Sequence, residues 1–248
     1  MDDKEMSVYE HLGELRKRLI IVVVFFVIAL VASFFFVEPV ILYLQQTDEA
    51  KELTMNAFRL TDPIKIYFQF AFVIAFILTA PVLLYQIWAF VSPGLYEKER
   101  RVTLSYIPLS IFLFLAGVSF AYFVLFPFVV RFMQNLAERL GIHQVIGINE
   151  YFQFLLHLVL PFGIVFQLPV VVMFLTRLGL ITPMLLVKVR KYAYLALLIL
   201  AAVITPPDVL SQVIVMIPLS ILYEISIWVS KMAYRKVLLA QKEQENLP

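Results

Sequence analysis

Residues 66–91, IYFQFAFVIAFILTAPVLLYQIWAFV, contain no charged side chain and are followed directly by Ser92-Pro93-Gly94. A helix needs about 20 apolar residues to cross the roughly 30 Å hydrocarbon core of a bilayer. A charge-free stretch of this length therefore predicts a transmembrane helix, even though Pro81 lies inside it. This prediction decides the class of fold.

The rest of the chain has the same character, since 62% of its 248 residues are apolar and 15% are charged. Ordinary globular chains are about 45–50% apolar and about 25% charged. We therefore expect an all-α polytopic membrane protein with six transmembrane helices in a single integral membrane domain over residues 1–248. The other five predicted spans are residues 19–37, 102–130, 151–176, 192–204 and 209–229.

The last two predicted helices are short. The fifth has an apolar run of thirteen residues, 192–204, which as a helix covers only about 20 Å. It ends at Thr205-Pro206-Pro207-Asp208. Either this turn lies below the lipid surface or the bilayer is thinner around it.

Both chain ends are predicted to be polar and cytoplasmic. Residues 1–18 form an amphipathic helix, in which Ser7 and Glu10 fit a capping box. Residues 232–248 form a polar tail. Six spans place fifteen of the 20 lysines and arginines on the side of the two termini, and basic residues concentrate on the cytoplasmic side. A multi-pass protein with both termini in the cytoplasm is expected.

Composition also excludes several kinds of chemistry. The chain has no cysteine and only three histidines, which are scattered, so thiolate sites are excluded and a zinc site has little support. A net charge of +2 does not suggest a nucleic-acid partner. No Walker loop, GxSxG or HExxH motif occurs. We expect no enzyme activity, no cofactor and no bound metal.

Two carboxylates on the predicted cytoplasmic side are the main candidates for binding. Glu14 and Glu99 together offer a surface for two guanidinium groups, because arginine forks match carboxylates. Each also has a simpler interpretation. Glu14 can pair with Arg18 at i,i+4, and Glu99 lies near the start of a helix, where anions are favoured.

Other polar residues lie within or beside the predicted spans. Gln167 can bond to a partner helix or to the backbone carbonyl that Pro169 leaves free. Tyr122 has the position of an interface aromatic, and Asp208 can cap the sixth helix. Glu224, near the end of that helix, is expected to reach Lys231 or water.

Several motifs together resemble the TatC family, polytopic subunits of the twin-arginine protein translocase. They occur in order along nearly the whole chain. They are HLGELRKRL (11–19), APVLLYQIWAF (80–90), PGLY (93–96) with ERR (99–101), FAYF (120–123) with FP (126–127), and TPPD (205–208) with Ser211-Gln212 and Pro218.

The resemblance implies a receptor for signal peptides with paired arginines, which helps folded proteins across the inner membrane at the expense of the proton-motive force. It assigns Glu14 and Glu99 to binding of the two arginines, with Arg16 and Phe90 beside them. Tyr122 and Asp208 match functionally sensitive positions. It also implies single-span partners of the TatA and TatB type, contact with membrane lipid, and possible homo-oligomers in the assembled complex.

One residue departs from the family pattern. The fourth helix usually carries Phe-Glu-x-Pro, whereas residues 166–169 are Phe-Gln-Leu-Pro. This departure counts against a role of Gln167 that requires ionisation and leaves hydrogen bonding to a partner helix open. Two rival functions are a small secondary transporter, with a broken-helix site at Gln167, Pro161 and Pro169, and a scaffold for single-span subunits.

Overall fold

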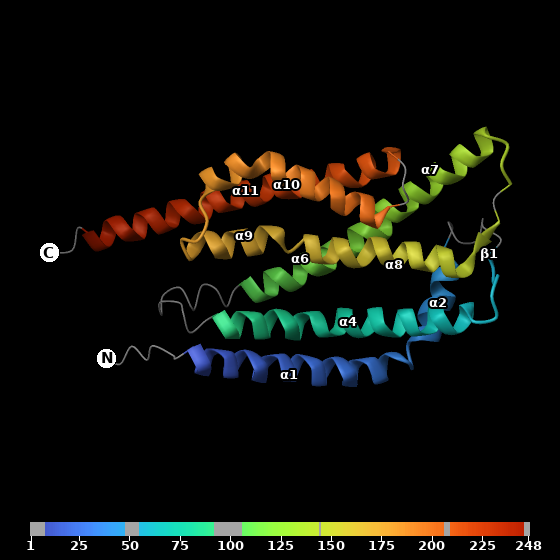
Figure 1. Cartoon of the computed structure of the whole chain (residues 1–248), viewed down its shortest axis with the longest axis horizontal. Coiled ribbons are helices and arrows are strands. Elements are labelled where there is room, and N and C mark those ends of the chain that lie inside the picture. The colour runs from blue at the N-terminus through green and yellow to red at the C-terminus, as the bar shows by residue number, and fades with distance from the viewer. Residues whose placement is uncertain (1–7, 48–54, 92–105, 144, 206–208, 246–248) are drawn as a thin grey trace. The chain divides into compact units, whose positions relative to one another are not determined.

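The computed structural model describes residues 8–47, 55–91, 106–143, 145–205 and 209–245. This part of the chain is almost entirely helical (Figure 1). Its elements are α1 (Val8–Ser33), α2 (Val37–Gln45), β1 (Met55–Asn56), α4 (Asp62–Val91), α6 (Tyr106–Phe120), a π-helix (Ala121–Leu125), α7 (Phe126–Arg139), β2 (Ile146–Gly147), α8 (Ile148–Val165), α9 (Leu168–Arg177), α10 (Pro183–Ile204) and α11 (Val209–Glu245).

The chain divides into two compact units. The first comprises Met1–Ile111 and Val145–Asn149, and the second comprises Phe112–Gln144 and Glu150–Pro248. We call them the N-terminal unit and the C-terminal unit and describe each by itself. A single membrane domain over residues 1–248 stays a prediction.

Four helical stretches in the described residues are long and apolar enough to cross a membrane: Asp62–Phe90, Ile107–Arg139, Ile148–Arg177 and Val209–Arg235. A bent pair, Leu12–Ser33 with Val37–Gln45, would add a fifth. The predicted fifth span, residues 192–204, lies in α10, whose first half carries Lys188, Arg190 and Lys191. The all-α membrane class is confirmed, and the count of six spans stays a prediction.

In the N-terminal unit, α1 and α4 lie side by side (Figure 1). Helix α1 passes without a break through residue 18, so residues 8–18 of the predicted amphipathic segment and the first span belong to one helix. Ser7 of the predicted capping box lies outside the described residues. No proline interrupts this helix, and the helical hydrogen bonds continue into the apolar residues. Many of these face outward: Leu19, Ile28 and Val31 are about 60% exposed (58%, 62% and 60%), as expected for contact with lipid.

A bend of 62° separates α1 from α2. The break exposes the Phe34 carbonyl, which accepts a 2.8 Å hydrogen bond from the Tyr67 hydroxyl of α4. The Tyr67 ring also stacks on Phe34, with centroids 5.9 Å apart. The segment between the first two predicted spans, residues 38–65, therefore contains most of α2 and the first residues of α4.

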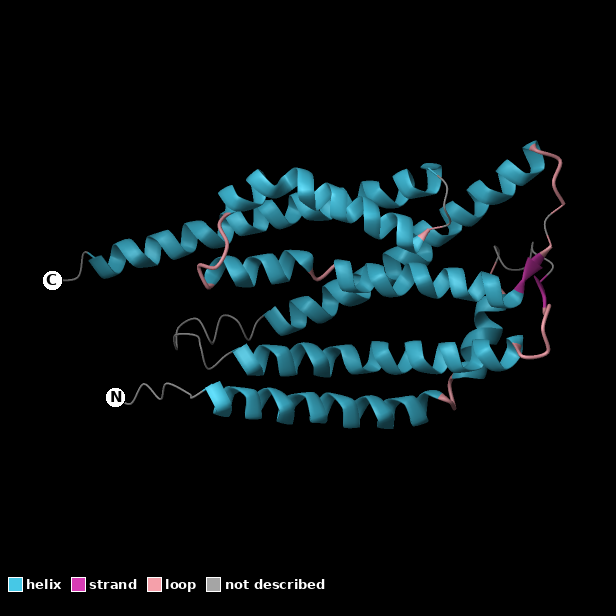
Figure 2. Ribbon diagram, viewed as in Figure 1, coloured by secondary structure: helices cyan, strands magenta, loops and turns pink. Residues whose placement is uncertain are grey.

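Two very short strands, which the sequence did not predict, lie beyond these helices (Figure 2). They pair in parallel, Met55 opposite Ile146 and Asn56 opposite Gly147. The pair belongs to the N-terminal unit.

The predicted third and fourth spans are longer and less regular than expected. The third continues beyond residue 130 to Arg139 and contains the π-helix, followed by Pro127 at the start of α7. The fourth is interrupted at Phe166–Gln167, between α8 and α9. Pro169 lies directly after this break, and it lacks the N–H that would continue the helical ladder.

In the C-terminal unit, α11 lies beside both α9 and α10 (Figure 1). The prediction of a short sixth helix, residues 209–229, is wrong in its end, because α11 is helical from Val209 to Glu245. The polar cytoplasmic tail from residue 232 stays a prediction. Helix α10 has 22 residues and so a length of about 33 Å. The prediction counted only the apolar residues that can lie in lipid. The helix itself also includes charged residues such as Lys188, which lie outside the apolar run.

The connection from α9 to α10 explains where α10 begins. After Arg177, Gly179 adopts a φ of +72°, a left-handed conformation that costs glycine little. The Thr182 hydroxyl then accepts a 3.2 Å hydrogen bond from the Leu185 N–H, and Pro183 occupies the first helical position. Both features are typical of a helix start.

Candidate functional site

The predicted binding carboxylate, Glu14, is held by an arginine of its own helix. Its Oε1 accepts a 3.0 Å hydrogen bond from Arg18 Nε and a second hydrogen bond from Arg18 Nη2. The two residues are one helical turn apart, at the spacing that brings side chains onto one face. The i,i+4 pairing considered from the sequence is therefore present.

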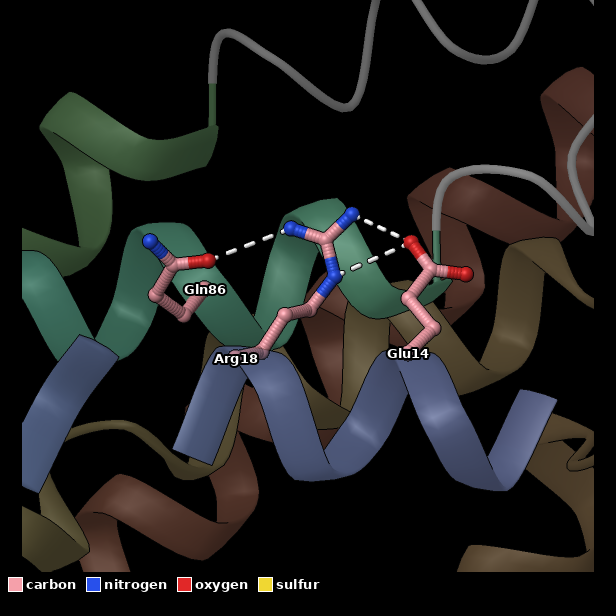
Figure 3. Close-up of polar contacts among 3 residues, drawn as sticks. All are labelled: Glu14, Arg18 and Gln86. Atoms are coloured by element: carbon pink, nitrogen blue, oxygen red, sulfur yellow. Dashed lines mark hydrogen bonds and ion pairs between the residues drawn. The ribbon is translucent and has the colours of Figure 1, made fainter. Parts of the chain in front are cut away.

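The same arginine connects α1 to α4. Arg18 Nη1 donates a 3.1 Å hydrogen bond to Oε1 of Gln86. Figure 3 shows the guanidinium of Arg18 between the Glu14 carboxylate and the Gln86 amide. The side chains of Arg18 and Glu14 are only 22% and 21% exposed, so this contact is stronger than an ordinary surface ion pair.

The two oxygens of the Glu14 carboxylate differ. Oε1 accepts both hydrogen bonds from Arg18, whereas Oε2 is buried and has no hydrogen-bond partner among the described residues. A fork-to-fork arginine pair would use both oxygens. One acceptor of this carboxylate therefore remains to be satisfied, and buried acceptors without partners are costly.

The other three residues predicted for this surface differ in their positions. Phe90 is half-buried on α4, four residues after Gln86 and therefore on the same helix face. Arg16 is exposed, two residues after Glu14 and on a different face of α1. Glu99 lies outside the described residues.

Two of the remaining candidates, Gln167 and Tyr122, lie in the C-terminal unit. Gln167 is half-buried at the break between α8 and α9, where its N–H donates to the Ile164 carbonyl and its carbonyl accepts from Val171 N. Tyr122 lies in the π-helix with its ring 4.7 Å from that of Phe123. Short π-helical segments often occur at functional sites. Asp208 lies outside the described residues.

The sequence did not predict a polar cluster between α10 and α11. Glu224 accepts a 2.9 Å hydrogen bond from Arg190 Nη2 and a 2.5 Å hydrogen bond from the Tyr194 hydroxyl. From the sequence, Glu224 is expected to reach Lys231 or water. Its side-chain partners in the described residues are Arg190 and Tyr194, and its side chain is 42% exposed, within reach of water. Arg190 and Tyr194 are four residues apart on one face of α10, a spacing that could have suggested a shared partner on the neighbouring helix.

This cluster predicts a measurable contribution to the pairing of α10 with α11. Glu224→Gln should lower the free energy of unfolding in detergent by about 0.5–1 kcal/mol, because the pair is partly exposed and such ion pairs are weak. Glu138→Gln, at an exposed position of α7, serves as the matched control. Equal unfolding free energies for the two variants would show that the cluster does not stabilise the helix pair.

Comparison with known proteins places the chain in a family. The family model described as Sec-independent protein translocase protein (TatC) matches residues 10–218. The chain belongs to the TatC family. The match includes Glu14, Arg18, Gln86 and Gln167, so the carboxylate held between α1 and α4 lies within the family's shared region. The members of this family are protein translocase components.

Individual TatC proteins are similar over almost their whole length. TatCy of Bacillus subtilis strain 168 is 64% identical over 236 residues, covering 95% of this chain and 93% of the relative. TatC of Halalkalibacterium halodurans is 58% identical, covering 98% and 96%. A crystal structure of TatC, described as a twin-arginine translocase receptor, has a TM-score of 0.82 at 37% identity and covers 90% of this chain and 99% of that one.

Proposed function

We propose that this chain is the subunit of a twin-arginine translocase that recognises signal peptides with paired arginines at the cytoplasmic face of the inner membrane. Glu14 and Glu99 bind the two guanidinium groups, and Arg16 and Phe90 line the surface around them. Both termini of the chain are cytoplasmic in this account.

The observation that carries the proposal is that Glu14 already holds a guanidinium group. Arg18 lies within hydrogen-bond distance of Oε1, and the second oxygen is without a partner in the described part of the chain. The chemistry that suits Arg18 equally suits the arginine of a peptide. A carboxylate that is mostly covered by protein also interacts more strongly with a cation than one in bulk water.

The remaining steps need partner subunits. We propose that single-span subunits of the TatA and TatB type contact the chain within the membrane, with Gln167 as a hydrogen-bonding contact. The proton-motive force then drives passage of the folded cargo. Lipid surrounds the exposed apolar faces, and copies of the chain can associate in the assembled complex.

Gln167 provides a separate test of partner contact. Gln167→Ala removes an amide that can bond across helices, and such interactions contribute about 0.6–2 kcal/mol in membranes. We expect crosslinking to a TatB-type subunit to fall about threefold to tenfold, while binding of the signal peptide is unchanged. Full partner crosslinking and full transport after this substitution would reduce Gln167 to a packing residue.

The function itself is tested with the full chain reconstituted in lipid vesicles. A fluorescent peptide with two arginines should bind, and a matched peptide with two lysines should bind at least tenfold more weakly, because lysine lacks the planar fork. The vesicles should show no solute uptake. Uptake by the chain alone, with no preference for the arginine peptide, would favour the secondary transporter.

A further inference from the structure

We propose that Arg18 is an internal competitor for the arginine-binding carboxylate, occupying Glu14 until an arginine of a signal peptide displaces it, and that Gln86 controls how firmly Arg18 is held. This inference rests on the proposed function and adds a regulatory residue to it. It follows from the contacts of one side chain with two helices.

Every nitrogen of the Arg18 guanidinium has an acceptor. Nε and Nη2 donate to Oε1 of Glu14, and Nη1 donates to Oε1 of Gln86 at 3.1 Å. Arg18 is therefore fixed on the binding carboxylate rather than extended into solvent. The neighbouring bases Arg16 and Lys17 are exposed, whereas Arg18 is only 22% exposed and holds the Glu14 carboxylate.

This occupancy changes the charge that a cationic ligand meets. Glu14 and Arg18 form a pair with no net charge and are about four-fifths covered (21% and 22% exposed). A cation that approaches this pair gains little attraction unless Arg18 moves away. Arg18 thus lowers the affinity of the surface for any base, including arginine.

The internal contact is also weaker than the contact that could replace it. Arg18 uses one oxygen of the carboxylate, while Oε2 has no partner among the described residues. A peptide arginine that engages both oxygens would form the stronger fork-to-fork geometry. Exchange would satisfy Oε2 and would release Arg18 from both Glu14 and Gln86.

Such an exchange favours guanidinium over ammonium. Lysine carries a compact charge without a planar fork, so it gains less from the two carboxylate oxygens while it must still displace Arg18. Because any base must displace Arg18, the internal arginine lowers the affinity for arginine and for lysine by the same factor. The preference for arginine comes from the fork-to-fork contact with the carboxylate.

The test compares Arg18→Gln with Lys17→Gln in the full chain in lipid vesicles. Both variants remove one positive charge from adjacent positions, but only the first frees Glu14. We expect Arg18→Gln to bind the two-arginine peptide about tenfold more tightly than Lys17→Gln does, since a charge-assisted contact no longer competes. The preference for two arginines over two lysines should stay the same, because both peptides must displace Arg18 from the unmodified site.

Gln86→Leu is a second variant that keeps Arg18 in place. It removes the acceptor on α4 and should tighten binding of the two-arginine peptide about threefold, as expected for the loss of a single hydrogen bond. If Arg18→Gln does not fold, Gln86→Leu alone tests the proposal. Lys17→Gln is the reference for both variants. The proposal would be overturned if Gln86→Leu, and Arg18→Gln where it folds, bind the two-arginine peptide no more tightly than Lys17→Gln does.

Glu14→Gln in the same assay separates this inference from the proposed function. If Glu14→Gln abolishes binding but Arg18→Gln gives no gain, Glu14 binds the peptide and Arg18 does not compete. If Glu14→Gln binds like the unmodified chain, the proposed site itself is wrong, and the role of Arg18 falls with it.

Discussion

Replacing Glu14 with glutamine is expected to weaken binding of a two-arginine signal peptide by about tenfold or more. Glutamine keeps the size of the side chain but loses the charge, and hydrogen bonds to charged groups contribute about 1.5–3 kcal/mol each. The change also removes the partner of Arg18, which leaves an uncompensated base at the site and repels the incoming arginine. Titration of a fluorescent peptide into vesicles that contain the chain measures the effect.

The matched control is Glu38→Gln. Glu38 is an exposed carboxylate in the first turn of α2, beyond the opposite end of α1 from Glu14. Its loss changes the net charge by the same amount without touching the proposed site. Equal affinity losses for Glu14→Gln and Glu38→Gln would indicate a general charge effect and not a binding carboxylate.

Replacing Gly117 with alanine is expected to lower the free energy of unfolding by about 1–3 kcal/mol, the usual cost of overpacking. A Cβ atom at this position would lie 2.7 Å from the Phe162 carbonyl oxygen and 2.7 Å from Cγ of Phe166. Because the first of these atoms belongs to the backbone of α8, it cannot move aside as a side chain could. Small residues let membrane helices approach this closely.

Gly13 provides the opposite case within the same chain. A Cβ atom there would meet nothing within 4 Å, so Gly13→Ala should raise the free energy of unfolding by about 0.5–1 kcal/mol through helix propensity alone. Denaturant unfolding in detergent, followed by circular dichroism, compares the two variants. If both glycines tolerate alanine equally, α6 and α8 do not pack as closely as described.

Much of this fold could be predicted because lipid imposes a simple rule on sequence. Charge-free runs such as residues 66–91 identify membrane helices directly, and the helix there begins at Asp62 and ends at Val91. The rule says nothing about where a helix ends outside lipid. For this reason α10 begins at Pro183 and α11 continues to Glu245, well beyond the apolar runs that revealed them.

The sequence allowed us to predict the contact of Glu14 within its own helix, but not the contacts between helices. Spacing along one helix allowed the pair of Glu14 with Arg18, and the structure contains it. The hydrogen bond from Arg18 to Gln86 joins residues 68 positions apart, and no local spacing rule relates them. For the same reason, the sequence did not identify Arg190 as a partner of Glu224, since the two residues are on different helices.

The central claim is that paired arginines bind at Glu14 and Glu99, and photo-crosslinking tests it most directly. A two-arginine signal peptide with a photoreactive group beside its arginines is irradiated with the reconstituted chain, and mass spectrometry locates the crosslinks. We expect crosslinks near Glu14 on α1 and Gln86 on α4, and we expect them to be lost after Glu14→Ala with Glu99→Ala. Undiminished crosslinking of the doubly substituted chain at the same positions would contradict the account.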